Sequence, residues 1–129
     1  MLSFDTNLAV HAANCDSASH AQSRGFIESL AARRDVAICE LMLLELYTLL
    51  RNPAVLAKPL TAHAAVDVCE AFRHHPHWQL IGLPPDSRAF HDAFWPRLRE
   101  KSFARRRAFD WRAALALTRQ GVTQFATVN

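Results

Sequence analysis

The sequence predicts an α/β domain built around a mainly parallel sheet. Four short apolar runs have the length of buried strands, and longer segments between them repeat apolar residues at helical spacing. Strands that alternate with helices over short connections favour parallel pairing within one sheet. In sheets of this kind, ligand sites gather beyond the carboxyl ends of the strands. Residues that directly follow the apolar runs are therefore the first candidates for chemistry.

Each element has its own signal in the sequence. Pro53 ends the second helical pattern, because proline cannot continue a helix, and Gly121 is a good C-terminal cap for the last one. A third helix begins at Thr61 and closes before His74, and a fourth begins at residue 86 or 87 and reaches at least Phe94. The remaining helices are expected over residues 18–33, 40–50 and 106–120, and the strands over residues 2–4, 36–39, 79–83 and 124–128.

The composition is that of an ordinary globular protein. Half of the 129 residues are hydrophobic, 21% are charged and the net charge is +3. No repeat or linker divides the chain, so residues 1–129 are expected to form a single domain. No apolar run approaches the roughly 20 residues that cross a bilayer, and the start lacks the leader of a signal peptide. We therefore expect a cytoplasmic protein with no membrane partner.

Two acids stand in apolar surroundings. Asp5 ends the first expected strand, where its carboxylate would lie at the rim of the sheet; a turn or helix-cap aspartate is the alternative. Glu45 lies in a helical segment so apolar that we expect it to be largely buried. An ionised carboxylate there must be paired, protonated or bound to a metal. No lysine or arginine lies three or four residues away, although a distant arginine stays open as a partner.

Asp110 is the third candidate acid, at the start of an alanine-rich helical segment. Arg106 and Arg107 lie at spacings that would let them pair with it, so an ordinary ion pair stays open. The stretch before Asp110 is basic, and such a cluster either follows a phosphate backbone or is a solvated helix end. The cluster consists of Lys101, Arg105, Arg106 and Arg107.

Three acids from three separate segments fit the chemistry of phosphodiester hydrolysis. Mg²⁺ and Mn²⁺ prefer carboxylate oxygens and are held by one or two protein acids together with water and phosphate. Such ions activate water and stabilise charge on the attacking and leaving oxygens. Asp5, Glu45 and Asp110, with a basic stretch beside one of them, therefore favour metal-dependent cleavage of a nucleic acid.

Other residue types give weaker signals. The three cysteines lack CxxC spacing, and His74, His75 and His77 lie in an expected loop without further ligands at zinc-finger spacing. The sequence contains no glycine-rich phosphate loop and no nucleophile elbow. These observations disfavour a zinc site, a nucleotide cofactor and a serine nucleophile.

The order of these segments resembles the PIN-domain family, and within it the VapC-like toxins of prokaryotic toxin–antitoxin pairs. Residues 2–7 (LSFDTN) match its opening strand followed by Asp-x-Asn. Its second motif, with a metal-binding helical glutamate, resembles residues 39–47 (CELMLLELY) with 50–53 (LRNP). Its third and fourth segments resemble residues 109–110 (FD), 113–116 (AALA), 121–122 (GV) and 125–127 (FAT). The resemblance runs in order over nearly the whole chain.

The resemblance implies a PIN-like three-layer α/β/α sandwich with a mainly parallel central sheet, and endonucleolytic cleavage of RNA with Mg²⁺ or Mn²⁺. It implies that Asp5, Glu45 and Asp110 are catalytic and bind the metal, with Asn7 as a supporting polar residue. It also implies a small antitoxin protein that blocks the site, and a homodimer. The basic cluster is then expected to contact phosphates of the RNA.

The C-terminal end departs from the family pattern. The family often has another acid at or shortly beyond the position of Asn129, where this chain has asparagine and stops. Two interpretations stay open. Either the chain is shortened before a C-terminal strand, with Asn129 as a supporting residue, or the protein has three of the four acids. The second case would weaken a second metal site.

Three other functions stay open. A non-catalytic PIN-like interaction module would keep the fold and the partner surface but lack a complete acid cluster. A receiver-like phosphoacceptor domain would need a central aspartate after a mid-chain strand and a late lysine, and the sequence supplies no convincing pair. A nuclease directed at DNA would use the same acids, because both nucleic acids require phosphate positioning and a metal.

Overall fold

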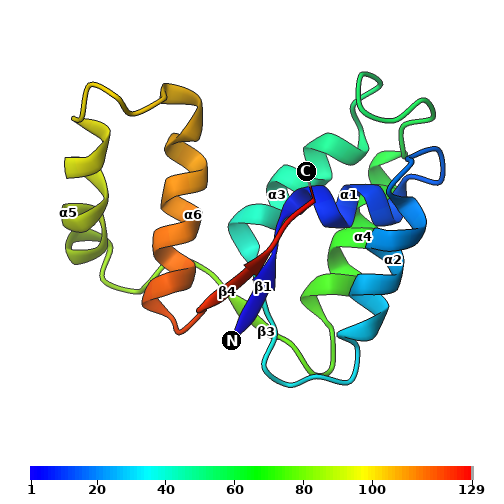
Figure 1. Cartoon of the computed structure of the whole chain (residues 1–129), viewed down its shortest axis with the longest axis horizontal. Coiled ribbons are helices and arrows are strands. Elements are labelled where there is room, and N and C mark those ends of the chain that lie inside the picture. Colours follow the sequence, from blue (N-terminus) through cyan, green and yellow to red (C-terminus); the bar gives the residue numbers. More distant parts are fainter. Residues whose placement is uncertain (129) are drawn as a thin grey trace.

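Short parallel strands and longer helices alternate along the computed structural model, which describes residues 1–128 (Figure 1). Every strand and helix expected from the sequence is present, and the expected boundaries hold to within a few residues. The strands are β1 (Leu2–Phe4), β2 (Ala37–Cys39), β3 (Gln79–Ile81) and β4 (Gln124–Ala126). The helices are α1 (Thr6–Ala13), α2 (His20–Ser29), α3 (Glu40–Leu50), α4 (Ala62–Arg73), α5 (Ser87–Leu98) and α6 (Ala108–Arg119), with a 3₁₀ helix, η1 (Arg105–Arg107), before α6.

The sheet places the first and last strands side by side. β1 pairs in parallel with β4, so that Leu2 faces Gln124 and Phe4 faces Ala126. β2 pairs in parallel with β3, and a parallel bridge between Leu2 and Val36 joins the two pairs. The strands therefore lie in the order β4–β1–β2–β3. This arrangement confirms the predicted α/β fold with a mainly parallel sheet.

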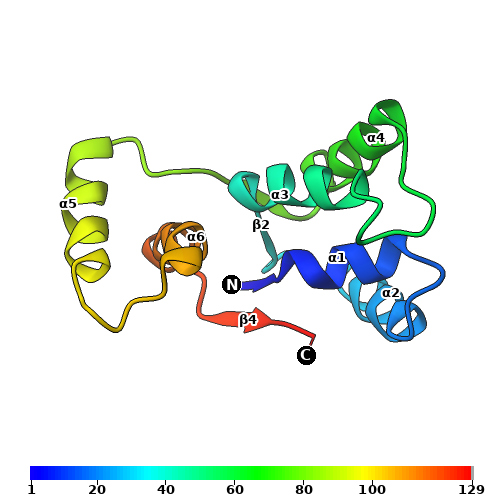
Figure 2. The same ribbon diagram turned by 90° about the horizontal axis from the view of Figure 1, so that it is seen from above.

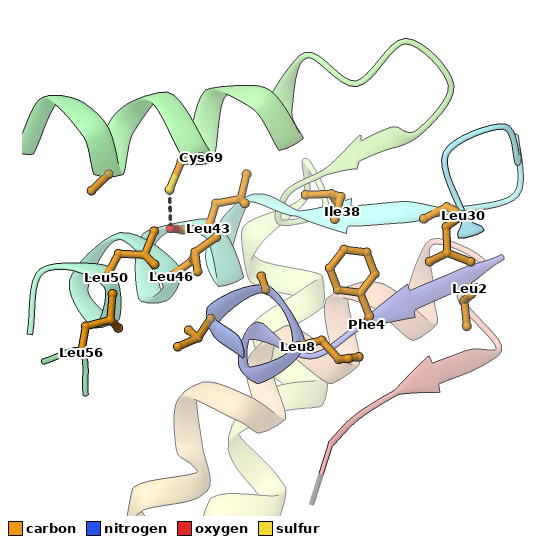
Figure 3. Close-up of a cluster of buried hydrophobic side chains, with 14 residues drawn as sticks. Leu2, Phe4, Leu8, Leu30, Ile38, Leu43, Leu46, Leu50, Leu56 and Cys69 are labelled. Atoms are coloured by element: carbon orange, nitrogen blue, oxygen red, sulfur yellow. Dashed lines mark hydrogen bonds between the residues drawn. The ribbon is translucent and has the colours of Figure 1, made fainter. Parts of the chain in front are cut away.

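Apolar clusters cover both faces of the strands. On β2, Ile38 belongs to one cluster while Ala37 and Cys39 belong to the other, because successive side chains of a strand face opposite sides. Figure 3 shows the first cluster, in which β1 and β2 pack against α1, α3 and α4. The second cluster joins β2 and β3 to α6 through Ile81 and Leu117. Helices thus form a layer on each side of the strands, as the predicted sandwich requires.

The structure contains one helix, α1, that was not predicted from the sequence. Leu8, Ala9 and Val10 are consecutive apolar residues, so they resemble an extension of the first apolar run more than a helical stripe. In the structure all three are buried, because α1 packs against both α2 and α3 and has little open surface. The helix begins directly after Asp5, which fixes this acid at the junction of β1 and α1.

α5 and α6 form a helical hairpin at one end of the molecule, with α5 outermost (Figure 2). The indole N–H of Trp111 donates to the carbonyl oxygen of Phe94 at 3.2 Å. The guanidinium of Arg97 lies 4.6 Å from the centroid of the Trp111 ring. The hairpin is therefore held by contacts of its own, and the turn between its helices carries η1 and the basic cluster.

The three cysteines form no disulfide with one another. Cys39 and Cys69 are buried, Cys15 is exposed, and all three are free. The thiol of Cys69 donates to the carbonyl oxygen of Leu43 at 3.5 Å, which links α4 to α3 (Figure 3). None of the helices within residues 1–128 has both the length and the apolar character that a bilayer span requires.

The two faces of α3 should respond differently to truncation. Leu46 is 1% exposed in the larger cluster, whereas Leu44 on the same helix is 69% exposed. We expect Leu46→Ala to lower the free energy of unfolding by about 2–5 kcal/mol, because it leaves a cavity. Leu44→Ala should change it by less than about 0.5 kcal/mol. Urea unfolding followed by circular dichroism measures both, and equal losses would contradict this assignment of the core.

Candidate functional site

An open cleft of about 1520 Å³ lies between α6 on one side and α3 with α4 on the other. Asp5, Asn7, Glu45 and Asp110 all line it, together with residues of β4. Asp5 follows the carboxyl end of β1, the position at which parallel sheets place their ligands. The structure thus brings the three candidate acids, which come from separate segments, to one cleft together with Asn7. Asn129 lies outside the described residues.

Asp5 is held by the neighbouring strand rather than by its own helix. It occupies the N-cap position of α1, yet its side chain makes no capping hydrogen bond. Its backbone N–H donates to the carbonyl oxygen of Ala126 at 2.8 Å. The hydroxyl of Thr127 donates to a carboxylate oxygen of Asp5 at 3.0 Å. The helix-cap alternative therefore does not account for this carboxylate, which remains directed at the cleft.

The hydrogen-bond partner of the Glu45 carboxylate is a hydroxyl group. A glutamate with a purely structural role in the interior would be paired with a cation. The hydroxyl of Thr6 donates to Oε2 of Glu45 at 3.2 Å, and within residues 1–128 no arginine, lysine or histidine forms an ion pair with this carboxylate. Glu40 on the same helix shows the contrast, because Arg73 binds it at 2.9 Å. The distant-arginine alternative thus applies to Glu40 and not to Glu45.

The surroundings of Glu45 disfavour its charged form. Its pKa is raised, first because the cleft walls remove water from around the carboxylate, and further by the negative charges of Asp110 and Asp5. The hydrogen bond from Thr6 acts in the opposite direction by stabilising the carboxylate. A carboxylate beside two further negative charges, as Glu45 is, makes a site at which a cation is favoured.

The expectation that the helix around Glu45 is largely buried is wrong. Leu43, Leu46 and Leu50 are the buried residues of α3, while Leu44 and Glu45 are exposed. The helix packs on the core through the three buried leucines and through Leu41 and Met42, while Leu44 and Glu45 line the open cleft. Apolar side chains that line the cleft made the sequence pattern resemble a helix buried all round.

Asp110 lies in the first turn of α6 and faces the same cleft. Neither Arg106 nor Arg107 forms an ion pair with it, and no other cation in the described chain does so. The spacing that favoured a local ion pair is therefore not used. Asp110 joins Asp5 and Glu45 as an acid without a basic partner.

The basic cluster divides between the cleft and the surface beside it. Arg106 lines the cleft, whereas Lys101, Arg105 and Arg107 are exposed in the turn before α6 and do not line it. Arg112 also lines the cleft and was missed in the sequence. Its signal is weak: it lies three residues after Phe109 in the same helical stretch, but two residues after Asp110, a spacing that does not place two side chains on one helix face.

Two threonines also escaped prediction from the sequence. Thr6 and Thr127 each donate a hydroxyl to one of the candidate acids. Thr6 had a signal, since it stands between Asp5 and Asn7 in the opening motif. Thr127 had none by itself, because only the pairing of β1 with β4 brings it to Asp5.

The donor set fits Mg²⁺ or Mn²⁺ by chemistry, since all three candidate ligands are carboxylates in a solvent-open cleft. As the side chains lie, no three His, Cys, Asp or Glu residues in the described part of the chain are close enough to hold a metal together. The acids line one cleft without forming a closed ligand cluster. Metal binding would therefore have to draw the carboxylates inward.

Comparisons with known proteins point in one direction. The chain is 43% identical over 129 residues to "Ribonuclease VapC24" of Mycobacterium tuberculosis, covering 100% of this chain and 86% of the relative. The structure matches VapC20 of M. tuberculosis, described as a sarcin-ricin loop cleaving toxin, with a TM-score of 0.73, 16% identity and coverage of 100% and 90%. It matches VapBC2 from Rickettsia felis, bound to a DNA fragment from their promoter, with a TM-score of 0.61, 18% identity and coverage of 95% and 84%. No family model matches the chain.

The raised pKa of Glu45 has a measurable consequence for stability. As pH rises from the ordinary glutamate value of 4.5, the unfolded chain releases this proton before the folded protein does. The folded state then binds more protons, so stability falls until the raised pKa is passed. Glu45→Gln keeps a side-chain oxygen that accepts the hydrogen bond from Thr6, but it has no proton to release. The variant therefore lacks this fall in stability with rising pH. In metal-free buffer its stability relative to wild type should therefore increase from about pH 4 to pH 7.

Urea unfolding at a series of pH values measures this difference. Glu40→Gln is the matched control on the same helix, and it should give no such gain because it breaks the contact with Arg73. A stability difference between Glu45→Gln and wild type that does not vary with pH would show that Glu45 titrates normally.

Proposed function

The chain belongs to the VapC family of PIN-domain ribonucleases, and we propose on this basis that it is a toxin endoribonuclease that cleaves RNA in the cleft between α3 and α6. The observation that carries the proposal is the 43% identity over all 129 residues to a VapC ribonuclease, together with three acids that line one cleft and form no ion pair within residues 1–128. The non-catalytic module considered from the sequence would have no need for a glutamate whose pKa is raised by burial and by two neighbouring carboxylates.

Asp5, Glu45 and Asp110 are proposed as the metal ligands and catalytic acids, and Asn7 as a supporting polar group. A bound Mg²⁺ or Mn²⁺ supplies an activated water and a positive charge for the oxygens of the scissile phosphate. The protein's own part is to hold the carboxylates. Thr127 and Thr6 do so through hydroxyl hydrogen bonds of 3.0 and 3.2 Å. Oxygen-only donors favour these hard cations over zinc.

The basic cluster is proposed to hold the RNA beside the acids. Arg106 faces the cleft, and Lys101, Arg105 and Arg107 extend the positive surface away from it along the turn before α6. Such contacts position a phosphate backbone without reading its sequence. Because Arg106 lines the cleft, it would lie close to the reacting phosphate. Lys101, Arg105 and Arg107 would hold the flanking phosphates.

A small antitoxin protein is proposed as the partner that blocks the cleft. Support comes from the family and from the likeness to VapBC2 of R. felis. Exposed apolar side chains also line the cleft and would be covered by such a partner, as Leu44 and Phe125 illustrate. A homodimer, a single domain over residues 1–129 and a cytoplasmic location are proposed on the same family grounds.

Cleavage of RNA tests the proposed function. We expect the wild-type protein to cleave a mixed RNA pool with Mg²⁺ or Mn²⁺ and to lose that activity with a chelator. Asp5→Asn should lower kcat by more than the roughly 10- to 100-fold that follows loss of an outer-shell contact to a metal ligand. Asp110→Asn should lower turnover while leaving RNA binding largely intact. Cleavage that persists equally in both variants or in chelator would sink the metal-dependent mechanism.

The basic cluster has its own test in the salt dependence of RNA binding. Replacing Lys101, Arg105, Arg106 and Arg107 by glutamine should weaken binding and lower the slope of log affinity against log salt by about 0.7 per lost phosphate contact. Arg34→Gln is the control, because Arg34 is exposed and does not line the cleft. An unchanged affinity in the fourfold variant would show that the cluster is only a solvated helix end.

A further inference from the structure

A stripe of alternating cations and an aromatic ring runs along the α6 wall of the cleft. Arg106, Phe109 and Arg112 follow one another at intervals of three residues, and all three line the cleft. Phe109 is 77% exposed, although its ring is apolar. The guanidinium of Arg112 lies over this ring at 6.0 Å from its centroid, a cation–π geometry that orients the ring without covering it.

The charge around this stripe indicates what kind of molecule covers it. Residues 97–112 contain seven of the 15 basic residues and two of the 12 acidic ones, a net charge of +5, whereas the rest of the chain has a net charge of −2. The whole positive excess of the protein therefore lies on the hairpin that carries Phe109. A polyanion is attracted to this surface, and an apolar protein segment gains nothing from the charge.

We propose that Phe109 stacks on an unpaired base of the RNA, next to the phosphate that is cleaved, and so restricts the enzyme to single-stranded or loop RNA. The inference rests on the proposed ribonuclease function and deepens it. Phe109 directly precedes Asp110, so a base on its ring belongs to a nucleotide beside the acids. Arg106 and Arg112 on either side hold the adjoining phosphates, and the ring holds the base between them.

The restriction to unpaired RNA follows from the geometry of stacking. Bases within a duplex are stacked on one another and offer no face to a protein ring, whereas bases of single strands and loops can be splayed onto an aromatic side chain. Phe109 has no hydrogen-bonding group, so it selects an unpaired base without choosing which one. Phe109 is therefore a positioning residue for the substrate and takes no part in proton transfer.

Binding measurements on substitutions at position 109 separate stacking from simple apolar contact. We measure fluorescence anisotropy with a labelled single-stranded RNA, in an Asp5→Asn background so that the probe is not cut. Phe109→Ala should weaken binding by about 5- to 150-fold, the loss expected for one stacked base. Phe109→Tyr and Phe109→Trp should bind the RNA as tightly as the parent. Phe109→Leu should lose as much affinity as Phe109→Ala, because leucine is apolar but has no flat ring on which a base can stack.

Two controls accompany these variants. Trp95→Ala removes an aromatic side chain that is 62% exposed on α5 but does not line the cleft, and it should leave binding unchanged. A duplex of the same RNA should bind equally to the parent and to Phe109→Ala. The thermal midpoint of Phe109→Ala should match the parent, since an exposed ring contributes little to folding.

An abasic scan of the probe identifies the stacked nucleotide. One abasic position should weaken binding to the parent about as much as Phe109→Ala does, and it should cost nothing further in Phe109→Ala, because both changes remove the same contact. Additive losses at every position would overturn the proposal. So would parent-like binding by Phe109→Leu, or a change in self-association of Phe109→Ala in sedimentation, since either outcome makes the ring a protein contact.

Failure of the ribonuclease function is distinguishable from failure of the stacking proposal. If wild type cleaves RNA but Phe109→Ala binds the single strand like its parent, only the stacking proposal is wrong. If wild type binds RNA through Phe109 but cleaves nothing, the stacking proposal stands and the catalytic function falls. If wild type neither binds nor cleaves, both are overturned.

Discussion

The parallel pairing of β1 with β4 is the contact on which the site depends. It joins residues near opposite ends of the described chain, and the backbone N–H of Asp5 donates to Ala126 just where both strands end. This register brings the Thr127 hydroxyl to the Asp5 carboxylate at 3.0 Å. The same strand end starts α1, whose first residue, Thr6, donates to Glu45. One strand pairing thus positions two of the three acids.

The cleft holds its acids in an electrostatically unfavourable arrangement. Glu40 and Glu45 lie on the same helix, and the protein supplies Arg73 to the first while leaving the second with a hydroxyl and two neighbouring negative charges. A structural carboxylate would resemble Glu40. The cations are instead grouped on the hairpin of α5 and α6, where they are available to an anionic ligand. Within the described chain, acids without basic partners beside a group of free cations suit a site that binds a metal and a phosphate backbone together.

The sequence predicts the parallel α/β fold because strand-length apolar runs and helical periodicity are local signals. It also singles out Asp5, Glu45 and Asp110, since an ionised carboxylate in apolar surroundings is unfavourable unless it has a partner or binds a metal. Burial of α3 could not be predicted, because an apolar side that lines a cleft has the same pattern as one that packs. Thr127 could not be predicted either, since its role follows from strand register and not from its neighbours in the chain. The exposure of Phe109 is likewise a tertiary property.

Binding of a divalent cation by the three acids is tested most directly by thermal unfolding at increasing Mn²⁺. A ligand that binds only the folded state raises the melting temperature by mass action, and the unfolded chain cannot assemble three dispersed carboxylates. The wild-type melting temperature should rise steadily with Mn²⁺. That of the triple variant Asp5→Asn, Glu45→Gln, Asp110→Asn should not respond, although the protein folds. An equal rise in both proteins, or no rise in wild type, would contradict a metal site formed by these acids.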